Sequence, residues 1–459
     1  MTESLRNVFA IPELRKRLFF TFAMLAVYRV GCFIPSPGVD PTALLELMES
    51  LGGGLLGFVN NFTGGSLGRV AIFSLGIMPY ITASIILQLL TVVWPYLEKL
   101  SKEGEMGRKK ITQYTRYLTV VISLVQSTSI AIFLAKTSTP TGAPLVPNAG
   151  IGFVLITAIT VTTGCAFVMW LGEQISERGI GNGISLIIFA GIVVGTIPAI
   201  INTFVKVKDG QIPLLSMIFL SVFMLLVVAF IVYMEKGQRR IPVQYAKRVI
   251  GRKVYGGQST YLPLRVNTGG VIPVIFASSV VMVPTAVLSN WNNSWIQSIV
   301  RVLGPGEILY YLAYVVAIIF FCYFYISIIF NPQDVAENMR KHGGFIPGIR
   351  PGRRTSDYID RILTRLTLVG SLYLAAVSVL PGFLLSGVRV GALGSVGQRL
   401  DALLPTWVTT GMGIDFFFGG TSLLIVVGVA MDFVQQVESQ LVMRNYEGFM
   451  KKGRVRGRR

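Results

Sequence analysis

Residues able to carry enzyme chemistry are few in this sequence, and none has the setting that a reaction needs. His342 is the only histidine, and the three cysteines, Cys32, Cys165 and Cys322, all lie in or beside apolar runs. Thiols in such positions are typical of small buried side chains rather than of a disulfide framework or a metal site. We therefore expect no metal centre and no cofactor.

Two glycine patterns resemble catalytic or nucleotide-binding motifs by spacing alone. Gly64 to Gly68 fits the G-x-S-x-G pattern of a hydrolase elbow, but no strand precedes it and no plausible base is near. Gly52 to Gly57 fits G-x-G-x-x-G without the flanking strand and helix that a dinucleotide site requires. No Gly-Lys dipeptide occurs, so a Walker A phosphate loop is absent. The sequence predicts a protein that is not an enzyme and does not hydrolyse nucleotide itself.

The elements that carry these residues are apolar runs long enough to span a membrane. Hydrophobic residues make up 52% of the 459 residues and charged residues only 14%, which lies outside the usual range of soluble chains. A run of roughly 17 to 25 apolar residues crosses about 30 Å of hydrocarbon. Ten such runs occur: Leu18–Ile34, Leu75–Trp94, Tyr117–Ala135, Ile151–Leu171, Ile184–Phe204, Leu214–Met234, Gly270–Ser289, Ile308–Phe330, Leu363–Leu385 and Val408–Val434.

Basic residues set the orientation of these spans, because Lys and Arg beside a span resist translocation. With the amino terminus in the cytosol, 33 of the 41 Lys and Arg residues fall in cytosolic segments. Arg29 interrupts the first run, which argues against a cleaved signal peptide. We expect both termini in the cytosol.

Charge inside the spans is nearly absent, and this bears on the kind of transport. Glu307, Asp415 and Asp432 lie near span ends, and Arg29 alone lies deep. A coupled carrier needs a titratable or cation-binding site within the membrane, and the sequence offers no good one. A substrate-coupled carrier or a lipid-handling protein nevertheless stays an alternative, since unwound backbone can bind Na⁺.

Local patterns in and between the spans resemble the SecY family of protein-conducting channel subunits. Any one pattern would be weak, but six occur in the family's order along a ten-span chain. They are Gly64–Leu90 (GGSLGRVAIFSLGIMPYITASIILQLL), Gly172–Gly183 (GEQISERGIGNG), Tyr245–Arg248 (YAKR), Gly270–Pro273 with Phe276–Ser279 (GVIP, FASS), Pro347–Gly352 (PGIRPG) and Gly419–Ile425 (GGTSLLI).

The resemblance implies an all-α membrane fold with two five-helix halves of opposite orientation around an hourglass pore. The halves would be residues 1–205 and 206–434, followed by a basic cytosolic tail, 435–459. An odd number of spans in each half by itself forces the second half to run inverted. In this fold the chain would be the central channel of the general secretory pathway, in the cytoplasmic (inner) membrane of a bacterium.

In the family a ring of aliphatic side chains forms the pore constriction. By motif position the ring falls on six isoleucines: Ile77, Ile81, Ile184, Ile188, Ile275 and Ile425. Residues four apart share one helix face, so the paired positions can point at one axis. A narrow apolar ring gives ions no replacement for their hydration shell. Without the resemblance, isoleucine in a span would be expected to face lipid or a neighbouring helix.

Two further elements are implied beside the ring. Gly64 to Phe73, within a segment of about 55–74, resembles the plug, a short non-spanning helix that closes the pore from outside; an ordinary outer loop is the alternative. Its named residues are Gly64, Gly65, Ser66, Arg69 and Phe73. The lateral gate, where signal sequences and membrane helices leave sideways, would include Thr82, Gln88 and Asn267, with simple helix-to-helix hydrogen bonding as the alternative.

The basic cytosolic loops are the remaining candidate surface, since clustered Arg and Lys suit phosphates of ribosomal RNA or acidic protein patches. The candidate docking residues are Arg239, Arg240, Lys247, Arg248, Arg252, Lys253 and Arg350. The resemblance implies the SecA ATPase and the ribosome as drivers docking here, and SecE and SecG as small membrane subunits. It also implies secretory preproteins with signal sequences, the lipid bilayer, and SecDF and YidC. Plain topology or lipid head-group binding is the alternative for these charges.

Overall fold

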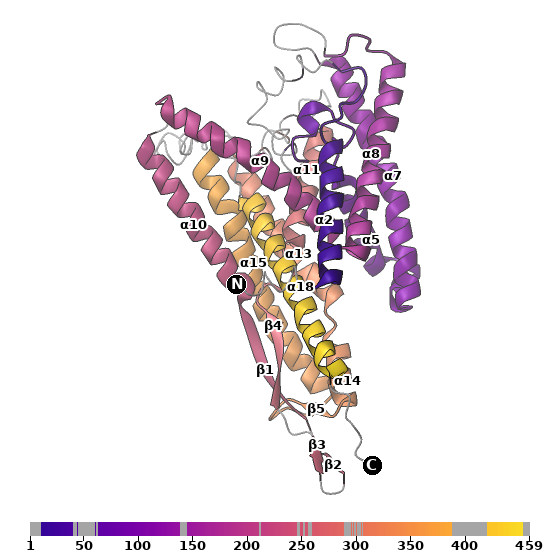
Figure 1. Ribbon diagram of the computed structural model, residues 1–459, viewed down its shortest axis with the longest axis vertical. Helices are drawn as coiled ribbons and strands as arrows, with labels where there is room; N and C mark the ends of the chain where they lie inside the picture. The colour runs from indigo at the N-terminus through magenta and orange to yellow at the C-terminus, as the bar shows by residue number, and fades with distance from the viewer. Residues whose placement is uncertain are drawn as a thin grey trace. The chain divides into compact units, whose positions relative to one another are not determined.

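The structure, a computed structural model, is built almost entirely of long helices (Figure 1). It describes residues 11–39, 63–137, 145–210, 213–245, 248–250, 253–255, 259–288, 306–387 and 420–452, together with single residues between these ranges. The predicted helical fold class is confirmed.

A helix overlaps each of the ten predicted spans. They are α2 (Pro12–Gly31), α5 (Met78–Val93), α7 (Glu105–Lys136), α8 (Ile151–Arg178), α9 (Gly183–Lys208), α10 (Leu214–Lys236), α11 (Ile272–Leu288), α13 (Ile308–Ile329), α15 (Arg353–Ser386) and α18 (Gly420–Lys452). Seven of them, α7 to α10, α13, α15 and α18, are long and apolar enough to cross a membrane. The pair α5 and α6 (Pro95–Lys102) counts as an eighth if the bent pair is one span.

The two remaining helices fall below those limits for identifiable reasons. In α2, 20 residues long, Glu13 and the basic residues 15–17 occupy the first two turns, and Arg29 lies near the end. The helix α11 is shorter, and its 17 residues are few for crossing about 30 Å of hydrocarbon. Ten helices at the predicted positions are therefore consistent with ten spans, and seven or eight meet the test of length and composition.

Several helices extend well past the predicted spans. The 32 residues of α7 correspond to roughly 48 Å at about 1.5 Å per residue, so the helix continues beyond about 30 Å of hydrocarbon. Its first turns carry Arg108, Lys109 and Lys110, which belong in water. Likewise α18 continues to Lys452, so part of the predicted basic tail is helical.

A sharp break separates α5 from α6. The two helices are bent by 99° at Trp94, whose backbone is extended with ψ 112°. Proline disfavours helical geometry in the residue before it and is well suited to the first position of a new helix. Pro95 therefore ends the apolar α5 and begins the amphipathic α6.

A small antiparallel sheet occupies the loops that the sequence analysis left without structure. Strand β1 (Gln238–Tyr245) pairs with β4 (Ser259–Arg265) in the register Ile241 to Leu262, and β5 (Gly344–Phe345) pairs with the end of β1. A second ladder joins β2 (Arg248–Ile250) to β3 (Lys253–Tyr255). Ile241 and Val243 are buried on one side of β1, the period of two expected for a half-buried strand. The sheet was missed because the sequence analysis considered the charge of these loops and not the alternation of apolar and polar residues along them.

The contacts divide the chain into two compact units. Unit 1 consists of Met1–Val205, Asp415–Phe417 and Val429–Arg459, and unit 2 of Lys206–Ile414 and Phe418–Gly428. In unit 1, α7 packs on α5 and α8, and α2 packs on α8; in unit 2, α13 packs on α11 and α15.

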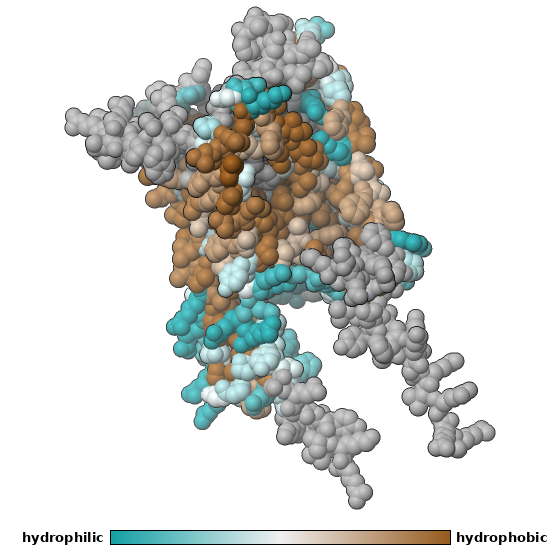
Figure 2. Space-filling model, turned by 60° about the vertical axis from the view of Figure 1, so that its left-hand side comes forward, coloured by the Kyte–Doolittle hydropathy of each residue, from teal (hydrophilic) through white to brown (hydrophobic). Residues whose placement is uncertain are grey.

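The outer faces of the helices are strongly apolar. Leu225 and Leu226 of α10 are 70% and 63% exposed, and Figure 2 shows hydrophobic surface covering the helices of the face drawn. Large apolar surface of this extent is unstable in water and suits contact with lipid. The chain is a multi-pass membrane protein.

Candidate functional site

The six isoleucines predicted for the pore ring lie on four helices, and five of them are buried. In unit 1, Ile77 immediately precedes α5 and Ile81 lies one turn into it, with the Ile81 N–H 3.2 Å from the Ile77 carbonyl oxygen. Ile184 and Ile188 occupy the first turns of α9; Ile188 is buried and Ile184 half-buried.

Unit 2 contains the other two positions. Ile275 lies in the first turn of α11 and Ile425 in the second turn of α18, exposed by only 5% and 0%. A pore ring needs an aliphatic side chain near the start of each helix that contributes to it, and all four helices have one. Their closing into one ring stays a prediction.

The segment predicted to be the plug, here residues 63–76, consists mainly of turns. Its only helix is a three-residue 3₁₀ helix, Leu67–Arg69, and residues 55–59, 61 and 62 of the predicted plug lie outside the described residues. Gly64, Gly65 and Gly76 have φ of 67°, 82° and 54°, in the left-handed region that favours glycine, and Val70 has φ 42°. These conformations prevent a longer α-helix within residues 63–76.

Hydrogen bonds within and around this segment fix its fold. Ser66 Oγ lies 2.8 Å from the Thr63 carbonyl oxygen and 2.9 Å from that of Phe73. The chain after α2 adds a short antiparallel bridge, in which Ser36 N–H donates to Val70 O at 2.8 Å and Ile72 N–H to Ile34 O at 2.9 Å. The plug segment is thereby attached to the chain that follows α2.

Aromatic stacking and glycine contacts seat the end of the plug segment. The Phe73 ring lies between Tyr28 and Phe167, with ring centroids 6.0 Å and 5.9 Å apart and nearly parallel planes. A Cβ added to Gly164 of α8 would lie 1.9 Å from the Ile72 carbonyl oxygen, which no packing allows. The close approach of the segment to α8 therefore depends on glycine at that position.

Two arginines lie where the plug segment meets the end of α2. Arg29 belongs to α2, and Arg69 belongs to the plug segment itself. Arg29 Nη1 donates to the Gly64 carbonyl oxygen at 2.7 Å. The guanidinium carbons of Arg29 and Arg69 lie 4.6 Å and 4.4 Å from the centroid of the Phe33 ring, within cation–π range. Sequence reasoning noted that Arg29 is deep in a span but assigned it no partner.

The three predicted gate residues differ in their hydrogen bonding. Thr82 Oγ1 donates to Met78 O in its own helix at 3.1 Å, and the buried Gln88 Oε1 accepts no hydrogen bond from any residue that the structure describes. Asn267, 5% exposed, donates through Nδ2 to Glu235 Oε1 at 2.6 Å and to Gly270 O at 3.1 Å. Glu235 was missed by the sequence analysis; its position at the end of α10, beside the basic loop, was the available signal.

Three of the predicted docking residues, Arg239, Arg240 and Arg350, belong to one packed body in unit 2. A core of Ile241 and Leu264 from the sheet, with Ile346, Ile359 and Leu363, joins loops 238–265 and 331–363. We call this assembly the hairpin body; Figure 2 shows hydrophilic surface at the level of β1 and β4. The sequence analysis treated the two loops separately because nothing local indicates that β1 pairs with β5.

The described basic side chains of the hairpin body face solvent. Arg239 and Arg240 on β1 and Arg350 before α15 are exposed. Of the other predicted docking residues, Arg248 and Lys253 lie in β2 and β3, and Lys247 and Arg252 lie outside the described residues.

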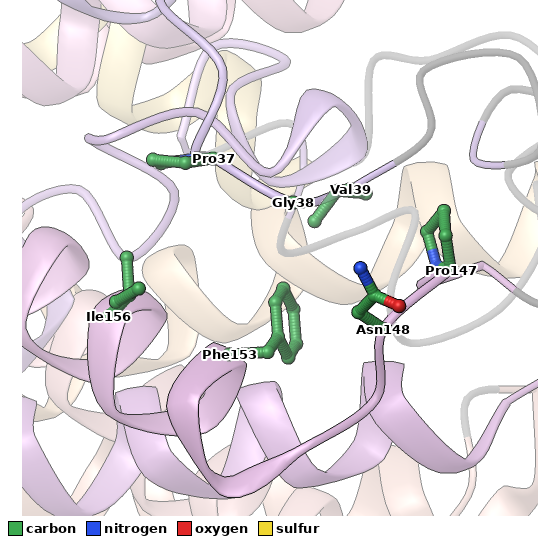
Figure 3. Close-up of a pocket in the computed structure, with 7 residues that line it drawn as sticks. All are labelled: Pro37, Gly38, Val39, Pro147, Asn148, Phe153 and Ile156. Atoms are coloured by element: carbon green, nitrogen blue, oxygen red, sulfur yellow. The ribbon is translucent and has the colours of Figure 1, made fainter.

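One cavity of about 500 Å³ opens between the end of α2 and the start of α8 in unit 1. Figure 3 shows Phe153 from α8 beneath Gly38 and Val39, and the remaining lining residues are Pro37, Pro147, Asn148 and Ile156. No charged side chain is among the lining residues. Within the described part of the chain, no three His, Cys, Asp or Glu residues are placed to hold a metal ion.

The fold and these features define a polytopic helical membrane protein with irregular, glycine-rich backbone between its spans, and comparisons place it in a class. A solved structure of a protein-conducting channel aligns with a TM-score of 0.61 at 17% identity, covering 96% of this chain and 95% of that one. Sec61 in the canine ribosome-channel complex aligns with a TM-score of 0.57 at 17% identity, covering 96% and 95%. The chain therefore has the fold of protein-conducting channels.

Sequence relationships then identify the family. The SecY family model matches residues 71–434. The protein translocase subunit SecY of Escherichia coli K12 is 48% identical over 453 residues, 97% of this chain and 96% of its own length. That of Aquifex aeolicus is 42% identical over 98% of this chain and all of its own length. The chain belongs to the SecY family, which confirms the predicted resemblance and the predicted function as a protein-conducting channel of a translocase.

Proposed function

We propose that the chain conducts unfolded preproteins through a constriction made by Ile77, Ile81, Ile184, Ile188, Ile275 and Ile425. The observation that supports it best is that aliphatic side chains, five of the six buried, occupy the first turns of four helices. An apolar ring of this kind excludes hydrated ions, yet its side chains can yield around a passing polypeptide.

The plug segment would seal this pore from the outer side in the resting state. The three left-handed glycines and the Phe73 stack give it one well-defined seated conformation. The short connecting turns around it contain little regular structure that would have to unfold on displacement. Its displacement would open the pore.

Thr82, Gln88 and Asn267 would belong to the lateral gate, through which signal sequences and membrane helices enter lipid. Hydrogen bonds between helices in a membrane contribute roughly 0.6 to 2 kcal/mol, enough to hold a gate without locking it. Of these three residues, Gln88 has a buried side-chain oxygen, Oε1, that accepts no hydrogen bond from the described residues.

The hairpin body would be the docking surface for SecA or the ribosome. Exposed arginines on a packed β-sheet present guanidinium groups with little loss of conformational freedom, which suits rRNA phosphates or an acidic protein patch. The chain would then act without nucleotide chemistry of its own, in the bacterial cytoplasmic membrane with both termini in the cytosol. SecE and SecG would assemble with it, and SecDF and YidC would cooperate with it.

Reconstitution tests this proposal. Vesicles containing the chain with SecE and SecG, given SecA, ATP and a precursor, should make the precursor resistant to external protease, and vesicles lacking the chain should not. Protection equal in both, or uptake of a small solute or lipid movement in place of protein transport, would favour the carrier or lipid-handling alternative.

A further inference from the structure

Arg29 is the one strongly charged side chain that the predicted spans place deep in the apolar region, and the pore, gate and docking proposals do not use it. It lies near the end of α2 and is half-buried. Within the described residues it forms no ion pair. Its described polar contact outside its own helix is the 2.7 Å hydrogen bond from Nη1 to Gly64 O, in the plug segment.

The accepting carbonyl is held in one place by tight packing. Gly64 has φ 67°, and a Cβ at this residue would lie 3.1 Å from the Cα of Gly191 in α9 and 3.3 Å from Arg29 Nη1. A side chain here would force these neighbours to shift and would be strained by the left-handed φ, so the backbone of Gly64 lies close to both α9 and the guanidinium. A charge-assisted hydrogen bond is roughly twice as strong as a neutral one, and more so where water is scarce.

The Phe33 ring keeps the guanidinium in this position. Arg29 lies 4.6 Å from the ring centroid, and Arg69, in the plug segment, lies 4.4 Å from it. The segment's own arginine thus shares the ring with the arginine of the span. Departure of the segment would take away both the Gly64 carbonyl and the Arg69 contact, and would leave the Arg29 charge without its described backbone partner.

We infer that Arg29 is a positioning residue that latches the plug segment in its seated state through the Gly64 carbonyl. This inference rests on the proposed role of residues 63–76 as the plug. The latch stabilises the closed state, because only there does the Gly64 carbonyl oxygen accept the hydrogen bond from Arg29. It also explains why an arginine, which is costly inside a membrane, occurs in this span, where the described residues give it no other role.

The resting ion permeability of reconstituted vesicles tests the latch. Arg29→Met, which keeps the chain length but cannot donate, should raise the leak by roughly tenfold, as expected for loss of a charge-assisted hydrogen bond. Arg29→Lys, which retains one charged donor, should restore much of the seal. Lys136→Met is the matched control, because it removes an exposed cation at the end of α7 that has no part in the plug, gate or docking proposals; its leak should stay near that of the parent.

A second measurement reports the seated fraction independently of leak. Pro35 and Ala71 face each other in the antiparallel bridge between the chain after α2 and the plug segment, so Pro35→Cys with Ala71→Cys places two thiols across it, with Cys32, Cys165 and Cys322 replaced by serine. Added oxidant converts the two thiols into a disulfide, and Arg29→Met should slow this crosslinking. A misfolded variant is recognised separately, by loss of protease-resistant channel from the same vesicles.

Deletion of residues 64–73 separates failure of the latch from failure of the plug. A deletion variant that leaks while Arg29→Met seals and crosslinks like the parent overturns the latch and leaves the plug role intact. A deletion variant that does not leak overturns the plug role itself. Equal leaks from Arg29→Met and Lys136→Met would also overturn the latch, because loss of the Gly64 hydrogen bond would then have no effect of its own.

Discussion

The plug segment and the hairpin body both lie between spans, yet they are built in opposite ways. The plug segment has one turn of 3₁₀ helix, left-handed glycines and buried backbone that depends on contacts with α2, α8 and α9. The hairpin body has a regular strand ladder over its own apolar core and exposes its arginines. The first is suited to leaving its seat, because contacts with neighbouring elements and not a regular ladder of its own hold it. The second is suited to bearing a partner without changing shape.

The largest expected effect is on the hairpin body. Arg350→Glu reverses an exposed charge on it, so we expect export to be abolished while membrane insertion of the chain is intact. The measurement is SecA-driven precursor transport with equal amounts of channel in the membrane. Lys110→Glu makes the same charge change on exposed α7 and should transport normally. Normal transport by Arg350→Glu would refute the docking role.

The core beneath the arginines gives the next effect. Ile241 is 2% exposed in that core, so Ile241→Ala should destabilise the hairpin body by about 2 to 5 kcal/mol. Limited proteolysis of the 238–265 loop measures it, and Thr260→Ala, at an exposed position of β4, is the control. Docking of SecA that is unchanged in a variant cleaved faster at this loop would show that a rigid body is unnecessary.

The plug segment gives a smaller effect of a different kind. Gly164→Ala would put a methyl group 1.9 Å from the Ile72 carbonyl oxygen, and relieving it should cost about 1 to 3 kcal/mol. Because the segment is the part able to move, we expect a higher resting ion leak. Gly152→Ala in the same helix has open space around its Cβ and should seal normally. An unchanged leak in Gly164→Ala would mean that α8 shifts to accommodate the methyl group while the plug segment stays in place.

The smallest effect concerns the joint between the hairpin body and the spans. Asn267→Leu removes the 2.6 Å hydrogen bond to Glu235, three residues before β1, and should change gating by roughly 0.6 to 2 kcal/mol. Export of precursors with weak signal sequences is the readout. Thr268→Val, next in the chain, should behave like the parent, and unchanged export of weak signal sequences by Asn267→Leu would remove Asn267 from the gate.

The sequence predicted the helices well because an apolar run of membrane length rarely forms anything except a spanning helix. It placed the ends of α7 and α18 poorly, because both helices continue beyond their apolar part. The hydropathy of a segment shows where a helix can contact lipid, and it does not show where the helix ends. The hairpin body was missed because its core joins Ile241 to Ile359, far apart in the chain. The plug segment was located by its motif, but its left-handed turns and the Arg29 contact depend on neighbours that no local pattern reveals.

The isoleucine ring is tested most directly by crosslinking a precursor stalled in transit to photoreactive residues in place of Ile81 and Ile275. A pore lined by this ring should give strong crosslinks at both positions and none at Val93, which is 77% exposed on α5. Crosslinks at Val93 equal to those at Ile81 and Ile275, or none at either isoleucine, would contradict the ring.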